Sequence, residues 1–91
     1  MRVALPKRDR LMIEMVIGSD VDRDTMYAEL RYQGRPWAEV VYDKERGGYV
    51  ATFYEGPGGT RMAIDLREAR QALLDARNAL VSRGYPDVSA G

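Results

Sequence analysis

The side chains considered first for chemistry are carboxylates, arginines and aromatics, and the sequence contains no histidine and no cysteine. Their absence excludes the commonest general base, thiolate nucleophiles and cysteine-containing zinc sites. The densest carboxylate cluster is Asp20-Val-Asp-Arg-Asp24, whose spacing matches positions one, three and five of an EF-hand loop. Thr25 stands where that loop needs glycine, and Arg31 stands where it needs a bidentate glutamate. We therefore interpret the cluster as a solvated turn.

Glu29 and Glu39 form the second candidate pair, since paired carboxylates can act as general acid and base when they converge in a cleft. With Arg31 beside them they are better explained as a cross-strand charge set. The segment Gly56-Pro-Gly-Gly59 lacks the Gly-Lys-Ser/Thr ending of a phosphate loop and fits a turn between strands. We expect no enzymatic activity, no cofactor and no metal site.

The elements that position these residues follow from the hydrophobic pattern. Five segments predict strands, by a short β-branched run or by strict alternation: Leu11–Ile17, Met26–Tyr32, Trp37–Asp43, Tyr49–Glu55 and Thr60–Ile64. The loops that join the last four are only a few residues long, so these strands must be antiparallel neighbours. Gly34 supplies the positive φ that the tight turn after Tyr32 needs.

One helix follows the strands. Asp65 is its predicted N-cap, with Glu68 three residues later as in a capping box, and apolar residues then recur at steps of three and four. Gly84 is placed to end the helix, and Pro86 prevents its continuation. The predicted fold class is α+β, an antiparallel meander of four to five strands followed by one C-terminal amphipathic helix on one face. Residues 1–10 are expected to be a flexible basic arm, 11–84 the single α+β domain and 85–91 a short tail.

The composition restricts the classes of function that the chain can have. The chain has 91 residues, enough for one domain, and its 14 basic and 14 acidic residues balance. No apolar run approaches the roughly 20 residues of a membrane span, and we expect a cytoplasmic protein. The zero net charge gives no overall field for nucleic acid. The N-terminal arm is locally basic through Arg2, Lys7, Arg8 and Arg10.

The face of the sheet that the helix does not cover is the predicted binding surface. If the helix packs on Ala28, Leu30, Ala38 and Val40, then Tyr27, Trp37 and Val41 point the other way. Either the set Tyr49/Ala51/Phe53 or the set Val50/Thr52/Tyr54 joins them. Monomers seldom expose large apolar patches, and Trp and Tyr are enriched in interface hot spots. The predicted interface residues are Tyr27, Glu29, Arg31, Trp37, Glu39, Val41 and Tyr54. The alternative is that Leu11–Ile17 or the arm folds back across this face.

The segment Gly47-Gly-Tyr-Val-Ala-Thr-Phe53, with Gly56-Pro-Gly58, a short strand and the helix from Asp65 to Leu80, resembles the core of HicB-like antitoxins. Those cores show a GGYVA-F strand, a proline–glycine turn and a helix with a Glu-Glu-Ala-type start. The match covers residues 38–83, and Leu11–Tyr32 has no counterpart in it. The family's C-terminal DNA-binding segment also has no counterpart in the sequence up to Gly91. The resemblance implies a non-catalytic module that binds and neutralises a protein partner.

Two hypotheses follow. The favoured one is a small bacterial or phage regulator that binds a protein, such as a toxin, a nuclease or a defence complex, and that forms a homodimer. The alternative is a single-stranded nucleic-acid-binding protein. The strand meander with one helix is similar in topology to positive-cofactor-type single-stranded-DNA-binding coactivators, and Tyr27, Arg31, Arg35 and Trp37 would then be the stacking platform.

Overall fold

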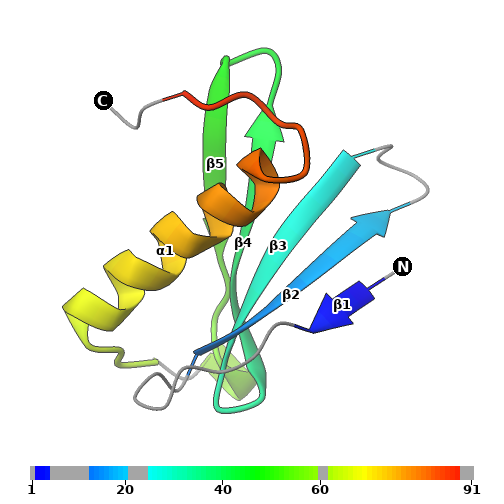
Figure 1. Ribbon diagram of the computed structural model, residues 1–91. Helices are drawn as coiled ribbons and strands as arrows, with labels where there is room; N and C mark the ends of the chain where they lie inside the picture. Colours follow the sequence, from blue (N-terminus) through cyan, green and yellow to red (C-terminus); the bar gives the residue numbers. More distant parts are fainter. Residues whose placement is uncertain (1, 5–12, 21–24, 60–61, 89–91) are drawn as a thin grey trace.

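A computed structural model describes residues 2–4, 13–20, 25–59 and 62–88. Its sheet has five strands in the order β1-β2-β3-β4-β5, and every neighbouring pair is antiparallel. The elements are β1 (Arg2–Ala4), β2 (Ile13–Asp20), β3 (Thr25–Tyr32), β4 (Arg35–Asp43), β5 (Gly48–Phe53), the 3₁₀ turn η1 (Pro57–Gly59) and α1 (Leu66–Val81). Figure 1 shows α1 lying diagonally across one face of the sheet. The predicted α+β meander with one C-terminal helix is confirmed.

Two ends of the sheet differ from the prediction. The segment Thr60–Ile64 was expected to be a strand, but Met62–Ile64 has no regular secondary structure; residues 60 and 61 lie outside the described ranges. The reason lies in η1, where Gly58 and Gly59 adopt left-handed conformations with φ of 67° and 77° and redirect the chain after β5.

A different strand, β1, completes the sheet. Arg2–Ala4, which the sequence placed in a flexible arm, pairs with β2 so that Val3 lies opposite Ile17. Residues 5–10 of that arm lie outside the described part of the chain.

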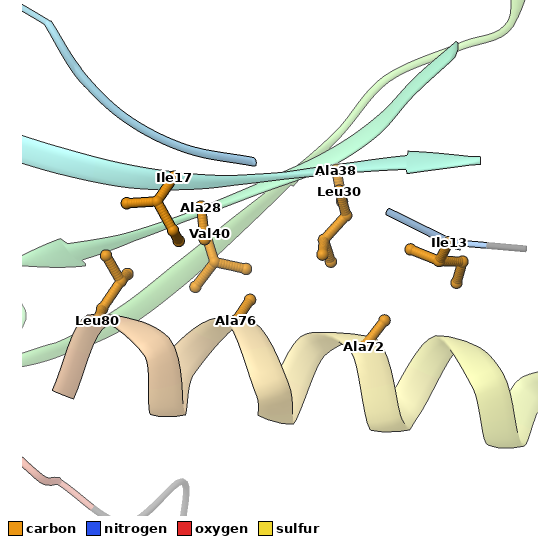
Figure 2. Packing of buried hydrophobic residues seen from close by; sticks show 9 residues of the cluster. All are labelled: Ile13, Ile17, Ala28, Leu30, Ala38, Val40, Ala72, Ala76 and Leu80. Carbon is orange, nitrogen blue, oxygen red and sulfur yellow. The ribbon is translucent and has the colours of Figure 1, made fainter. Parts of the chain in front are cut away.

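The core forms between α1 and the sheet, and alternation in the strands creates it. Figure 2 shows the sheet side chains pointing toward the helix and the helix side chains pointing back. The buried cluster consists of Ile13, Ile17, Ala28, Leu30, Ala38 and Val40 from the sheet and Ala72, Ala76 and Leu80 from α1. Small residues on the helix allow its backbone to approach the sheet closely, so Leu80 is the one large side chain that α1 buries completely. This is the covered face that the sequence predicted.

Both ends of α1 are capped as their residues predict. The Asp65 carboxylate accepts hydrogen bonds from the backbone N–H groups of Arg67 (2.9 Å) and Glu68 (3.2 Å). At the other end, Gly84 has φ 101° and donates to the Val81 carbonyl at 3.0 Å, while the Tyr85 N–H donates to the Leu80 carbonyl at 3.3 Å. This pair of bonds is the Schellman pattern, and it turns the chain back toward the sheet. No helix in the described ranges has the length and apolar character that crossing a membrane requires.

The C-terminal tail is held against the sheet by tyrosines. The backbone N–H of Met26 donates to the Tyr85 hydroxyl at 2.7 Å, and the Tyr49 hydroxyl donates to the Pro86 carbonyl at 2.6 Å. The Tyr42 ring lies between them, with its centroid 5.3 Å from that of Tyr49 and 6.3 Å from that of Tyr85. Desolvation by burial, followed by the neighbouring Tyr42, raises the pKa of the Tyr49 phenol above its usual 10.0. Residues 85–88 are therefore part of the fold.

Candidate functional site

Strand register brings most of the predicted binding residues together on the face opposite α1, which we call the far face. One row across it is Val16, Glu29, Glu39 and Thr52, and the next row is Gly18, Tyr27, Val41 and Val50. On β5 the set Val50/Thr52/Tyr54 belongs to the far face, because Tyr49 packs against the core on the helix side. Of the two sets left open by the sequence, the one containing Tyr54 is therefore the correct one.

The two central glutamates of the far face lie directly opposite each other on β3 and β4. Like charges in that position repel, so each carboxylate needs a partner. Arg31 Nη1 donates to Glu29 Oε1 at 2.7 Å, and its Nη2 donates to the Gly34 carbonyl at 2.6 Å. The Tyr54 hydroxyl donates to Glu39 Oε2 at 2.7 Å. The predicted cross-strand charge set is thus present, and Tyr54 and the β3–β4 turn fix its geometry.

Tyr27 lies over a glycine. A Cβ atom added to Gly18 would be 2.5 Å from the Tyr27 hydroxyl oxygen and 2.6 Å from its Cζ atom. The two residues are directly opposite in the β2–β3 register, so the ring fills the space that a side chain on β2 would take. Tyr27 is half-buried as a result, and the most exposed residues of the far face are Thr52 and Tyr54 on β5.

Trp37 was predicted on the far face, and this is wrong. In the β3–β4 register Leu30 pairs with Ala38 and Arg31 pairs with Pro36, which leaves Trp37 as an extra residue. Such a β-bulge interrupts alternation. Trp37 packs against the core cluster, and its ring centroid lies 5.6 Å from that of Phe53 on the helix side.

The pairing of β2 with β3 also excludes one alternative that the sequence left open, in which Leu11–Ile17 covers the far face. The segment that was considered as a cover for the far face, Leu11–Ile17, supplies instead the strand β2 from Ile13 onward. Residues 13–17 therefore lie within the sheet and do not cross its face; residues 11 and 12 lie outside the described part of the chain.

A groove of about 470 Å³ opens beside the charge set, at the end of the sheet that carries the β3–β4 turn. The described residues that line it are Glu29, Arg35, Pro36, Tyr54, Glu55 and Gly56. It combines two carboxylates and one guanidinium with the apolar surfaces of a proline and a tyrosine. Such a site suits a basic side chain, whose aliphatic stem packs on apolar atoms while its charge faces the carboxylates.

Four groove residues were not among the predicted interface residues, namely Arg35, Pro36, Glu55 and Gly56. Arg35 had been named only for the alternative stacking platform. Arg35 and Pro36 are the first two residues of β4, and Glu55 and Gly56 follow the end of β5, so alternation gives little signal for any of them. The only available signal was the position of Arg35 and Pro36 next to Gly34, at the tight turn that the sequence identified.

The described residues include no group of three carboxylate, histidine or cysteine side chains placed to hold a metal ion. In the acidic cluster considered at first, Asp20 ends β2, residues 21–24 lie outside the described ranges, and Thr25 begins β3. The candidate site is the charged, partly apolar groove at the end of the sheet. No family model, curated protein or solved structure gives a significant match to the chain, so its function has to be argued from this geometry.

Proposed function

We propose that this chain is a non-enzymatic protein-binding module and that its partner docks on the far face at the groove. The biological role would be that of a small bacterial or phage regulator, such as an antitoxin or an inhibitor of a nuclease or defence complex. The observation that carries this proposal is the groove itself, where Tyr54 and Pro36 offer apolar surface beside the carboxylates of Glu29 and Glu55.

The charge of the far face favours a partner with a basic surface. Glu29 and Glu39 lie at its centre and Glu55 lines the groove, and these three carboxylates outnumber the guanidiniums of Arg31 and Arg35. Arg31 is engaged by Glu29 and by the Gly34 carbonyl. Complementary potentials accelerate encounter and select the partner. Enzymes that act on nucleic acids present basic clefts to their substrates, so an inhibitor of such an enzyme would carry this type of surface.

The same features argue against the single-stranded nucleic-acid alternative. That hypothesis needs a platform of exposed aromatic and basic groups. Trp37 lies on the helix side, Tyr27 lies over Gly18, and the middle of the far face is acidic. The carboxylates of Glu29 and Glu39 would repel phosphates that approach the middle of this face.

The resemblance to HicB-like antitoxin cores supports the same class of function. The segment on which it depends contributes β5, the glycine turn η1 and the capped helix α1, whereas the short strand that the resemblance also includes is absent at Met62–Ile64. These elements support the sheet. The groove lies where the end of β5 meets the β3–β4 hairpin.

The test is a pull-down from host lysate in which the wild-type protein and its variants are used in parallel. Wild-type protein, Y54A, E29Q and the control R67E are immobilised, and retained host proteins are quantified; Arg67 is exposed on α1 and does not line the groove. A specific partner is then purified and its affinity is measured for each variant. We expect Y54A to weaken binding by about tenfold or more, as for an interface aromatic, and R67E to leave it unchanged.

Two results would count against the proposal. A purified partner that binds Y54A and E29Q as tightly as wild type would place its site elsewhere. Binding of single-stranded oligonucleotides at low salt, weakening steeply as salt rises and lost in Y54A, would favour the nucleic-acid function instead.

A further inference from the structure

The outer edge of β5 presents unused backbone groups. The Tyr54 N–H donates to the Trp37 carbonyl at 2.9 Å, so the even-numbered residues of this strand direct their backbone groups toward β4. In an antiparallel ladder the alternate residues point the opposite way. The N–H and C=O groups of Tyr49, Ala51 and Phe53 therefore face outward, and no backbone hydrogen bond among the described residues reaches them.

The sequence of β5 has none of the features that normally prevent strand pairing, and among the described residues the tail contacts it only near its start, where Pro86 accepts from the Tyr49 hydroxyl. The strand reads GYVATF, without charge, proline or an inward lysine, and it pairs with β4 in an unbroken register. Its outer half is open, since Ala51 is exposed and 57% of the Phe53 surface is accessible. The opposite edge, β1, is only three residues long, and short edge strands are a recognised protection.

The residues around β5 are arranged so that the strand complements a copy of itself. A two-fold axis through Ala51 pairs Tyr49 with Phe53 of the second copy, and it places the smallest side chain at the axis. It also places Glu55 opposite Gly47 of the second copy, next to Arg46. Arg46, which lies 3.6 Å from the Asp43 carboxylate in its own hairpin loop, would thus be the basic residue nearest Glu55 at each end of the pair.

We propose that the chain forms a homodimer in which two β5 strands pair antiparallel about Ala51 and join the two sheets into one. Shifting the register by two residues would keep the outward groups aligned but would shorten the overlap and separate the charges. The centred register gives about six backbone hydrogen bonds between the copies. Each Phe53 then packs against Tyr49 of the other copy, which covers the ring that α1 leaves exposed.

This inference does not rest on the proposed function. If a partner proved to bind outside the groove, the proposed β5 pairing would be unaffected. If the chain proved to be monomeric, the proposed binding at the groove would be unaffected. The two proposals therefore fail separately.

The first test is mass in solution, with a proline placed at the axis. Wild type should have twice the monomer mass at about 100 μM and dissociate on dilution, by mass action. A51P removes an N–H group that makes no bond to β4, and edge strands tolerate proline at such positions. We expect A51P to be monomeric with an unchanged circular dichroism spectrum, and the control A51S to remain dimeric.

The second test fixes the register and stays informative even if A51P fails to fold. Because the chain has no cysteine, A51C and F53C each introduce a single thiol. At the axis the two Cα atoms would be about 5.5 Å apart, within disulfide range. Two residues away from the axis on each chain, they would be about 13 Å apart.

Mild oxidation should therefore link A51C into a covalent dimer and leave F53C unlinked, after equal masses have been verified for both under reducing conditions. A monomeric wild type at about 100 μM would overturn the proposal. So would a dimer in which A51C links no faster than F53C, since that dimer would use another surface.

Discussion

Replacing Leu80 by alanine tests whether α1 is held to the sheet as Figure 2 indicates. The Leu80 side chain is fully buried, and the other two buried residues of α1 are alanines. Losing three carbon atoms costs about 0.8 kcal/mol each in transfer free energy, and the cavity that remains adds to this. The expected loss in the free energy of unfolding is about 3–4 kcal/mol. A chain of this length has roughly 5–14 kcal/mol in total, so the variant should be severely destabilised.

The same substitution can be made in the same helix at an exposed position. Leu66 is 82% accessible at the first residue of α1, so L66A removes an equal number of atoms without opening a cavity. We expect L66A to change the unfolding free energy by no more than about 0.5 kcal/mol. The pair therefore separates the effect of burial from that of helix propensity.

The assay is urea unfolding followed both by circular dichroism and by Trp37 fluorescence, since the half-buried Trp37 reports on the sheet–helix contact. In a parallel thermal scan L80A should lower the midpoint by roughly 12–32 °C, because each kcal/mol corresponds to about 4–8 °C in a domain of this size. Equal losses for L80A and L66A would refute the packing of α1 described above. A loss for L66A that depended on protein concentration would instead place Leu66 in an interface.

Three further predictions follow from individual contacts. G18A should destabilise the fold by about 1–3 kcal/mol in denaturant titrations, because its Cβ atom would meet the Tyr27 ring, and the double variant G18A/Y27A should recover part of that loss. The folded pKa of Tyr49 is raised above 10.0, so its contribution is complete below about pH 10 and is lost as pH rises through the folded pKa; the difference in unfolding free energy between wild type and Y49F should shrink above that pH, and a constant difference would contradict the shift. D65A should cost about 1 kcal/mol in thermal unfolding while D65N retains most of the stability, because the side-chain oxygen accepts from two backbone N–H groups; equal stabilities would show that the cap contributes nothing.

Much of the architecture could be predicted because it depends on local patterns. Period-two alternation assigned Ala28, Leu30, Ala38 and Val40 to the covered face, and all four are buried in the core. Capping and glycine signals located the start of α1 at Asp65 and its end near Gly84. Each of these signals is read from residues within a few positions of one another, so no knowledge of distant contacts was needed.

The candidate site could be predicted only where the strands stay regular. Glu29, Arg31, Glu39 and Tyr54 meet on the far face because alternation holds through their strands. Trp37 does not lie on the far face, because a bulge inserts one extra residue into β4. The bulge could not be predicted, because the residues around Trp37 alternate as in a regular strand. The residues that complete the groove lie at the start of β4 or after the end of β5, where alternation does not assign a face.

The sequence by itself determined the strands β2 to β5, the helix α1, the core-facing residues of β3 and β4 and the lack of cysteine and histidine chemistry. Only the tertiary structure decided that the first residues form an edge strand, that the tail is held by Tyr49 and Tyr85, and that β5 ends the sheet with its outer edge open. The physical reason is the separation along the chain of the residues that interact. Periodicity and caps act between neighbours in the chain, whereas register shifts, edge exposure and docking of the tail depend on contacts between residues far apart in sequence, such as Met26 and Tyr85.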